Sequence, residues 1–237
     1  MATQSGGAGS PQPGSVFSGQ HDRRKVTDWV YEELKAAIVE LRLAPGNPLR
    51  EATLADQLGV SKTPIREALT RLEQEGLVET TSFKGAVVSD YSRQDLTEIY
   101  ELRELLETAA VRIAAESMDD EARARLERIS DESQGLKTGN AAHLATLISE
   151  FDDVLFDQVH NSRIKALIEN LRAHLTRIGH LTEGIPGRIE ASVDEHKRIV
   201  EAIAANDPVA AENHLRDHIR SVRDDQLRAL GEAANQA

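Results

Sequence analysis

Four polar side chains occupy helix positions that should be apolar, and together they could bind a ligand. In each of four predicted helices after residue 93, the 3.6-residue period places one polar residue on the buried face. These residues are Arg103, Asp152, His196 and His218. Burying them unpaired would cost several kcal/mol each, so we expect them to face one another or a shared polar cavity.

The chemistry of this set suits a metal ion and an organic acid. One carboxylate and two neutral imidazoles, from Asp152, His196 and His218, are ligands for zinc, manganese, iron or nickel. Arg103, a permanently charged fork, could bind the carboxylate of a small organic effector beside the metal. His174 borders the buried stripe of the predicted helix 162–179, and His214 lies one turn from His218, so we place both with Arg103 as candidate effector-binding residues. The alternative is a buried salt bridge in which Asp152 pairs with Arg103 or with a histidine.

These side chains need a helical scaffold, and the pattern from residue 94 onward predicts one. Breaks rich in Gly, Pro, Asn and Asp separate six amphipathic segments, and no segment alternates as a strand would. The predicted helices are 94–117, 121–134, 139–159, 162–179, 189–205 and 208–230. The sequence therefore predicts an all-helical bundle of six or seven helices.

A second set of residues, in GVSKTPIREALTRLEQEG (residues 59–76), is suited to DNA. One face of this predicted helix is apolar, with residues at i, i+3, i+4 and i+7 that begin at Ile65. Lys62 and Arg66 lie one turn apart on the other face, and Ser61 is a suitable N-cap. A short helix with a cationic start fits a DNA major groove.

The segments around this helix complete a winged helix-turn-helix pattern. A short helix from about residue 51 precedes it, and Gly59 provides the turn between the two. Two β-prone runs, 77–81 and 86–89, follow and are joined by residues 82–85, which include Lys84 and Gly85. A hairpin with a cationic tip directly after a recognition helix is a wing.

Composition limits the alternatives. The 237-residue chain has no cysteine, which excludes disulfides and thiolate chemistry, and no apolar run approaches the roughly 20 residues of a membrane span. Residues 1–22 lack the apolar core of an export signal, so we expect a cytoplasmic protein. Residues 23–90 contain ten Lys/Arg and eleven Asp/Glu, so most of the net charge of −12 lies in the second domain. DNA binding must then depend on local clustering of basic side chains.

PGNPLREATLADQLGVSKTPIREALTRLEQEGLVETTSFKGAVVSD resembles the winged helix-turn-helix domain of GntR-type bacterial transcription regulators. The resemblance covers about residues 25–90. It implies DNA contacts from the start of the recognition helix and from the wing. The matching positions in this chain are Lys62, Thr63, Arg66, Lys84 and Gly85. Ala52 stands where many members carry a DNA-contacting arginine, and Leu41 stands where many carry glycine.

EIYELRELLETAAVRIAAE, FDDVLFDQVHNSRI and EHKRIVEAIAANDPVAAENHLRDHI resemble the FadR-type effector domain, called FCD. The predicted count of six helices is closer to its VanR-like branch than to the seven-helix branch. Metal-binding members use an Asp and a His four residues apart and two later histidines. His196 and His218 match the later pair in their spacing of 22 residues. Ile148 stands at the aspartate position and Asp152 at the first histidine position, so the resemblance implies at most three protein ligands.

The sequence thus predicts a mainly α protein that is divided into five parts. They are a disordered tail (1–22), a winged helix-turn-helix domain (23–90), a linker (91–93), a helical effector-binding and dimerisation domain (94–230) and a C-terminal tail (231–237). The predicted function is that of a homodimeric repressor that binds operator DNA and responds to a small carboxylate, with a divalent metal such as Zn, Ni or Mn. A metalloenzyme with a two-histidine, one-carboxylate site and an architectural DNA-binding protein are the alternatives.

Overall fold

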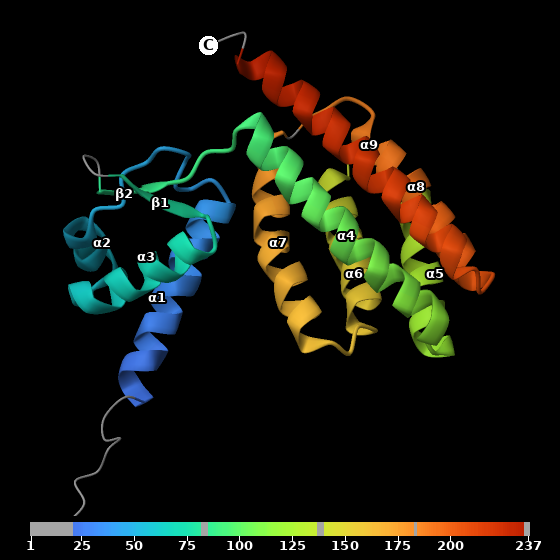
Figure 1. Ribbon diagram of the computed structural model, residues 1–237, viewed down its shortest axis with the longest axis horizontal. Helices are drawn as coiled ribbons and strands as arrows, with labels where there is room; N and C mark the ends of the chain where they lie inside the picture. The colour runs from blue at the N-terminus through green and yellow to red at the C-terminus, as the bar shows by residue number, and fades with distance from the viewer. Residues whose placement is uncertain (1–20, 82–84, 137–139, 183, 235–237) are drawn as a thin grey trace, which may run out of the picture.

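The computed structural model describes residues 21–81, 85–136, 140–182 and 184–234. These residues form a small domain with three helices and a hairpin, followed by a larger helical bundle (Figure 1). The predicted fold class is confirmed: the chain is mainly helical, and the sheet in the described part has two strands. None of the described helices is long and apolar enough to cross a membrane.

The first domain has the order expected of a winged helix-turn-helix. Its elements are α1 (His21–Val39), α2 (Glu51–Leu58), α3 (Lys62–Gln74), β1 (Val78–Thr81) and β2 (Gly85–Val88). The strands are antiparallel, and Val78 pairs with Val88. Gly59 makes the turn between α2 and α3 in the left-handed region, at φ 66°. Helix α1 begins inside the predicted tail, and Lys84 lies outside the described residues.

Leu41, after α1, adopts a φ of 58°. For a residue with a side chain this left-handed conformation costs roughly 1–2 kcal/mol. The geometry explains why glycine suits the position in similar domains, and it shows that this chain makes the same turn with a branched residue.

The second domain consists of six helices within the described residues. They are α4 (Arg93–Ser117), α5 (Asp120–Gly135), α6 (Ala141–Asp157), α7 (Ser162–Leu181), α8 (Arg188–Ala204) and α9 (Pro208–Ala234). The predicted helices match in number and order, with ends that differ by a few residues. A capping box of Ser92 and Asp95 begins α4, and the Asn161 side chain caps α7.

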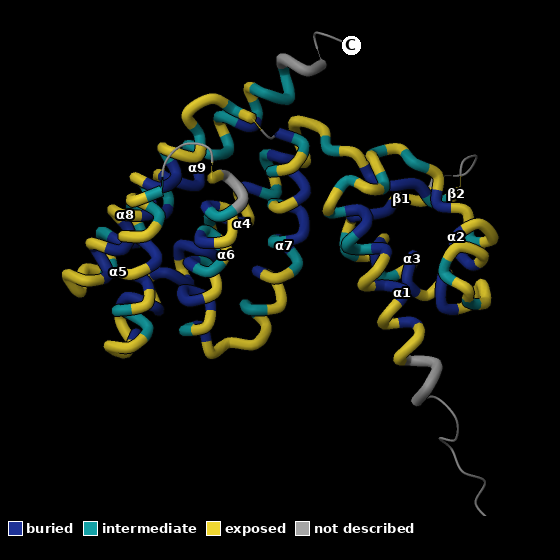
Figure 2. The backbone as a smooth tube through the Cα atoms, turned by 180° about the vertical axis from the view of Figure 1, so that it is seen from behind, coloured by how far each residue is buried: buried dark blue, intermediate teal, exposed yellow. Residues whose placement is uncertain are grey.

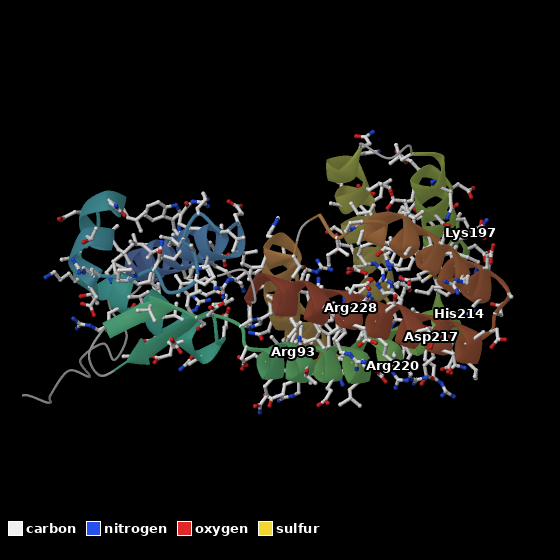
Figure 3. All side chains as sticks on the ribbon, turned by 90° about the horizontal axis from the view of Figure 1, so that it is seen from above. Arg93, Lys197, His214, Asp217, Arg220 and Arg228 are labelled. Carbon is white, nitrogen blue, oxygen red and sulfur yellow. The ribbon has the colours of Figure 1, made fainter. Side chains whose placement is uncertain are left out.

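Helices α4 and α9 pack along each other and cover the bundle, and their contact spans the whole length of α4 (Figures 1 and 3). At the start of α4, Arg93 Nη1 donates to the Leu227 carbonyl at 2.6 Å. In the interior, the Tyr100 hydroxyl donates to Gln226 Oε1, also at 2.6 Å. Arg220 pairs with Glu104 near the middle of α4, and Glu212 pairs with Arg112 toward its other end. These contacts join the first and last helices of the bundle.

Burial follows the predicted stripes with one correction on α4. Buried positions lie where the helices meet, and exposed positions lie on their outer faces (Figure 2). Arg103 is buried as expected, but Ile113, which the 3.6-residue period places on the same stripe, is 37 % exposed. The buried face of α4 runs instead through Tyr100, Glu107 and Val111. An acidic residue therefore occupies a core position that periodicity alone assigned to an apolar one.

Candidate DNA-binding and ligand-binding sites

The recognition helix α3 presents the predicted polar face to solvent. Ile65, Ala68 and Leu72 are buried in the core of the winged domain. Lys62, Thr63 and Arg66 are exposed on the opposite side. Ser61 is the N-cap residue, as predicted, although its side chain makes no capping hydrogen bond. The helix is therefore held by its apolar face and leaves the cationic face free to contact a ligand.

Arg66 is already paired in the free protein. Its Nε and Nη2 donate to the two carboxylate oxygens of Glu51 at 3.0 and 2.8 Å. The hydrogen bond from Arg66 lowers the pKa of Glu51. Glu51 is the first residue of α2, so the pair links the two helices of the motif. An exposed pair of this kind contributes little to stability, so a nucleic acid can replace the carboxylate. Sequence reasoning missed Glu51.

The hairpin tip is described only in part. Gly85 begins β2, is exposed and has a φ of 72°, which a residue with a side chain rarely adopts. Its Cα is paired with that of Thr81 across the hairpin. Glycine at this position thus meets a conformational requirement of the tight hairpin.

Arg103 lies in the bundle interior, and its partner differs from the expected one. Its Nε donates to Glu107 Oε2 at 3.0 Å, one turn further along α4, and both side chains are almost fully buried. Burial is the largest single influence and would lower the pKa of Arg103, but Glu107, through its charge and hydrogen bond, together with Tyr100 and Asp152 raises it. The salt-bridge alternative named Asp152 or a histidine as the partner. The structure corrects this: the pair is Arg103–Glu107.

Asp152 lies near this pair and feels its charges. Burial, followed by the nearby Glu107 carboxylate, raises the pKa of Asp152 to about 7, while Arg103 partly offsets the shift. The carboxyl group is therefore partly protonated near neutral pH. Asp152 therefore interacts electrostatically with both members of the Arg103–Glu107 pair.

His196 and His218 come together as predicted. Their ring centroids are 4.6 Å apart, and Phe151 stacks on His196 at 4.5 Å with nearly parallel planes. Burial lowers the pKa of both histidines well below the usual imidazole range, so both are neutral at pH 7. His218 Nδ1 lies 2.7 Å from Glu195 Oε2, so a neutral His218 donates this hydrogen bond and leaves Nε2 without the proton.

Glu195 joins this histidine pair to a buried arginine. Arg188, at the start of α8, hydrogen-bonds to Glu195 Oε2 and donates to Asp225 Oδ2 at 2.9 Å and to Ser221 Oγ at 2.8 Å. The network fixes the orientation of His218. Sequence reasoning missed Glu107, Glu195 and Arg188, although Glu107 follows Arg103 at the i+4 spacing typical of helical ion pairs.

The arrangement also tests the predicted metal site. Among the described residues, no three His, Asp or Glu side chains are grouped so that they could hold a metal ion. His196 and His218 supply two imidazoles, but Asp152 lies beside Glu107 and Arg103. The side chains as they lie thus fit a two-imidazole site bordered by a guanidinium better than a three-ligand site.

The other two histidines do not join the cluster. His214 lies on α9, where Figure 3 labels it beside Asp217, and is half-buried. His174 is buried on α7, where it hydrogen-bonds to Tyr91 and to the Glu75 carbonyl. The structure therefore places His174 at the junction with the winged domain, apart from Arg103.

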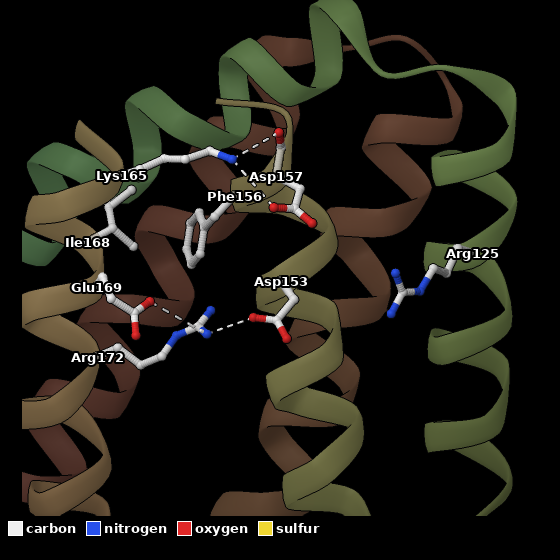
Figure 4. A pocket seen from close by; sticks show the side chains of 8 residues that line it. All are labelled: Arg125, Asp153, Phe156, Asp157, Lys165, Ile168, Glu169 and Arg172. Atoms are coloured by element: carbon white, nitrogen blue, oxygen red, sulfur yellow. Dashed lines mark hydrogen bonds and ion pairs between the residues drawn. The ribbon is translucent and has the colours of Figure 1, made fainter. Parts of the chain in front are cut away.

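A surface groove between α5, α6 and α7 has a volume of about 270 Å³ (Figure 4). Its lining residues are Arg125, Asp153, Phe156, Asp157, Lys165, Ile168, Glu169 and Arg172. Arg172 pairs with Asp153 at 2.7 Å, and Lys165 with Asp157 at 3.4 Å. These charges largely neutralise one another, and the groove contains none of the predicted site residues.

Comparison with known sequences identifies both halves of the chain. Residues 27–88 match the family described as bacterial regulatory proteins, gntR family, and residues 98–221 match the FCD domain. The HTH-type transcriptional regulator YdhC of Bacillus subtilis is 32 % identical over 192 residues, which cover 79 % of this chain and 85 % of that protein. A probable D-xylose utilization operon transcriptional repressor of Paenarthrobacter nicotinovorans is 29 % identical, covering 83 % and 87 %.

Solved structures show the same fold. McbR/YncC of Escherichia coli superimposes with a TM-score of 0.70 at 24 % identity, covering 86 % of this chain and 97 % of that one. A GntR family regulator from Pseudomonas syringae pv. tomato has a TM-score of 0.53 at 26 % identity, covering 91 % and 90 %.

Proposed function

Since the chain belongs to the GntR family of bacterial regulatory proteins, with an FCD domain, and is a DNA-binding transcriptional regulator rather than an enzyme, we propose a mechanism by which it controls transcription. In this proposal the protein is a homodimeric repressor. It binds a short palindromic operator through α3 and the wing, and a small organic acid in the bundle changes its affinity for DNA.

The observation that carries DNA recognition is the exposed face of α3, where Lys62, Thr63 and Arg66 project from a helix fixed by its other side. The name of the Paenarthrobacter relative supports repression as the direction of control. The direct test is selection of duplexes from a random pool by the purified full chain. Enrichment of a palindrome with two half-sites is expected, and a pool that stays random would contradict the proposal.

A dimer is proposed because α4 carries exposed apolar side chains on one face. Leu102 is 41 % exposed, Leu105 71 % and Ile113 37 %, at spacings that place them along one side of the helix. Exposed apolar patches of this kind are typical of interfaces, and a second copy would cover them symmetrically. Paired half-sites also suit a winged domain without a basic excess.

Leu105→Glu is expected to convert the dimer to a 26 kDa monomer and to weaken operator binding, because the new charge would be buried in the interface. Sedimentation at micromolar concentration measures this. The matched control is Leu167→Glu on α7, another half-exposed leucine, which should leave the mass unchanged. A wild-type chain that sediments as a monomer and still binds the operator tightly would exclude the proposed dimer.

For the effector, the buried cluster supports a small carboxylate. Arg103 supplies the permanent charge, and the imidazoles of His196 and His218 line the same interior. A carboxylate could take over the place of Glu107 at the guanidinium. Stabilisation of the full chain by members of a panel of small carboxylic acids, measured as a rise in Tm, tests this step.

A divalent metal held by His196 and His218 stays a proposal alongside acid binding, and Asp152 would complete the predicted set only if its side chain turned toward the two imidazoles. When bound, such a metal would act as a Lewis acid that binds a carboxylate oxygen of the effector. Elemental analysis after incubation with Zn²⁺, Ni²⁺ or Mn²⁺ is the measurement. If the site exists, wild-type protein should retain about one ion per chain, and His196→Ala should retain none. His160→Ala, at an exposed histidine, is the matched control. Equal retention by wild type and His196→Ala would exclude these ligands.

A further inference from the structure

The end of the recognition helix is capped by a residue of the other domain. Gly76 turns the chain at φ 78°, and the N–H groups of Gly76 and Leu77 bond to the carbonyls of Glu73 and Leu72 at 3.0 and 2.9 Å. The Glu75 carbonyl accepts instead from His174 Nε2 of α7, at 2.7 Å. A carbonyl only accepts, so Nε2 of His174 carries the proton.

The second ring nitrogen of His174 is also used. Its Nδ1 lies 2.7 Å from the Tyr91 hydroxyl, in the connection between β2 and α4. With the proton on Nε2, a neutral ring accepts at Nδ1, and Tyr91 donates. One imidazole therefore ties the end of α3 to the segment that leads into the helical domain. The neutral ring, in the tautomer that carries the proton on Nε2, satisfies both hydrogen bonds.

Arg177, one turn further along α7, reinforces the same contact. It is fully buried, and its Nη2 donates to the Ser89 carbonyl, directly after β2. Its guanidinium lies over the Tyr91 ring, 4.8 Å from the centroid. Within the described residues, its Nε and Nη1 have no hydrogen-bond partner. Ala173 on the same face belongs to the core of the winged domain. In Figure 1, α7 is the bundle helix that faces this domain.

We propose that His174 and Arg177 are positioning residues for DNA recognition, which fix the end of α3 and the Ser89–Tyr91 connection to α7. The helical domain then sets the orientation of α3 through this helix. The expected effect on DNA affinity rests on the proposed function, whereas the contact between α7 and the winged domain does not. A change in the bundle that shifts α7 would move the cap on Glu75 and, with it, the recognition helix.

The contact is sensitive to protonation of His174. Burial lowers its pKa, the bond to the Glu75 carbonyl opposes this shift, and the Arg177 charge adds to it. The Glu75 carboxylate favours protonation and Lys35 disfavours it; both Lys35 and Tyr31 of α1 hydrogen-bond to that carboxylate. A protonated ring would carry an N–H at Nδ1, where Tyr91 already donates.

The sign of the pH effect follows from the lowered pKa. The unfolded chain titrates near 6.5, whereas the folded chain disfavours the imidazolium. Stability from this contact is therefore fully present above about pH 6.5 and is lost as pH falls from there toward the lowered folded pKa. Mild acid should loosen the end of α3. His196 and His218 add a similar dependence in the bundle, so variants of His174 must separate the two.

Hydrogen exchange of the amides of residues 74–78 in the full chain tests the contact without DNA. His174→Ala should reduce their protection about tenfold at pH 7.5, the effect of one lost hydrogen bond. His174→Gln keeps an N–H for the Glu75 carbonyl, so its protection at pH 7.5 should equal that of wild type. Because glutamine does not titrate, the drop in protection that wild type shows between pH 7.5 and 5.5 should be smaller in this variant. His160→Ala, at an exposed histidine, should behave as wild type.

Affinity for a duplex enriched by the wild-type chain tests the consequence. His174→Ala should bind it about tenfold more weakly, while His174→Gln and His160→Ala should bind as wild type. Wild-type protection and wild-type affinity in His174→Ala would overturn the inference, as would loss of protection at 74–78 with unchanged affinity. If no duplex is enriched, the proposed function fails, and the exchange of residues 74–78 still decides whether the cap exists.

Discussion

Arg103→Ala is expected to lower the free energy of unfolding by about 3–5 kcal/mol, because it removes one partner of a buried ion pair. Glu107 is almost fully buried beside Arg103, and Asp152 lies within range of both charges. Without the guanidinium, the buried Glu107 would lose its ion-pair partner, and the partly buried Asp152 would keep only the more distant charge of Arg172. Urea denaturation followed by circular dichroism measures the loss.

The matched control for this variant is Arg112→Ala, on the same helix. Arg112 is half-exposed and pairs with Glu116 and Glu212 at 3.3 Å, so its loss should change stability little. The double variant Arg103→Met with Glu107→Leu should recover much of the stability, since it leaves no unpaired charge from the pair. An Arg103→Ala chain as stable as Arg112→Ala would show that the interior is hydrated and the pair is not a buried one.

Arg66→Ala is expected to weaken operator binding by roughly tenfold to a hundredfold and to relax the base preference at one position of each half-site. The reason is the forked guanidinium on the exposed face of α3, which can bind a base edge with two hydrogen bonds. Fluorescence anisotropy with the selected duplex and a scrambled one, at fixed salt, measures both effects. Equal loss on both duplexes would instead assign Arg66 to phosphate.

Glu51 provides the internal control for Arg66. The carboxylate holds the same two nitrogens that a base would take, so Glu51→Gln should free the guanidinium and raise affinity for both duplexes a few-fold. Glu73→Gln makes the same charge change at an exposed position near the other end of α3. If both substitutions raise affinity equally, the gain comes from net charge alone.

Lys84→Ala should weaken all duplexes alike and reduce the salt slope by about one.

The sequence predicted those parts of the fold that follow from local periodicity. The two faces of α3, the six later helices in their order and the inward direction of Arg103 all follow from the 3.6-residue period and from caps. In the second half of α4 the 3.6-residue period predicts burial less well, since Ile113 is exposed and Glu107 is buried. A buried ion pair reverses the usual assignment of polar residues to the surface.

The partners of the polar residues could not be predicted, because they depend on tertiary geometry. Periodicity shows that a side chain points inward, but the choice between Glu107 and Asp152 for Arg103 depends on rotamers and helix rotation. In the sequence, His174 borders an apolar helix stripe, as a residue that lines an interior cavity would. In the structure, this stripe faces the winged domain. The stripe of a helix that lies between two domains does not reveal which of them it contacts.

The pairing of α4 with α9 also bears on the order in which the chain folds during synthesis. The winged domain closes its core with contacts close in sequence, apart from Ala173. The bundle instead depends on pairs such as Tyr100 with Gln226, which are 126 residues apart. Until α9 has left the ribosome, the side of α4 that packs against α9 has no cover, so the nascent bundle exposes apolar surface for much of translation. Chains truncated before α9 should therefore retain a folded winged domain attached to an aggregation-prone remainder.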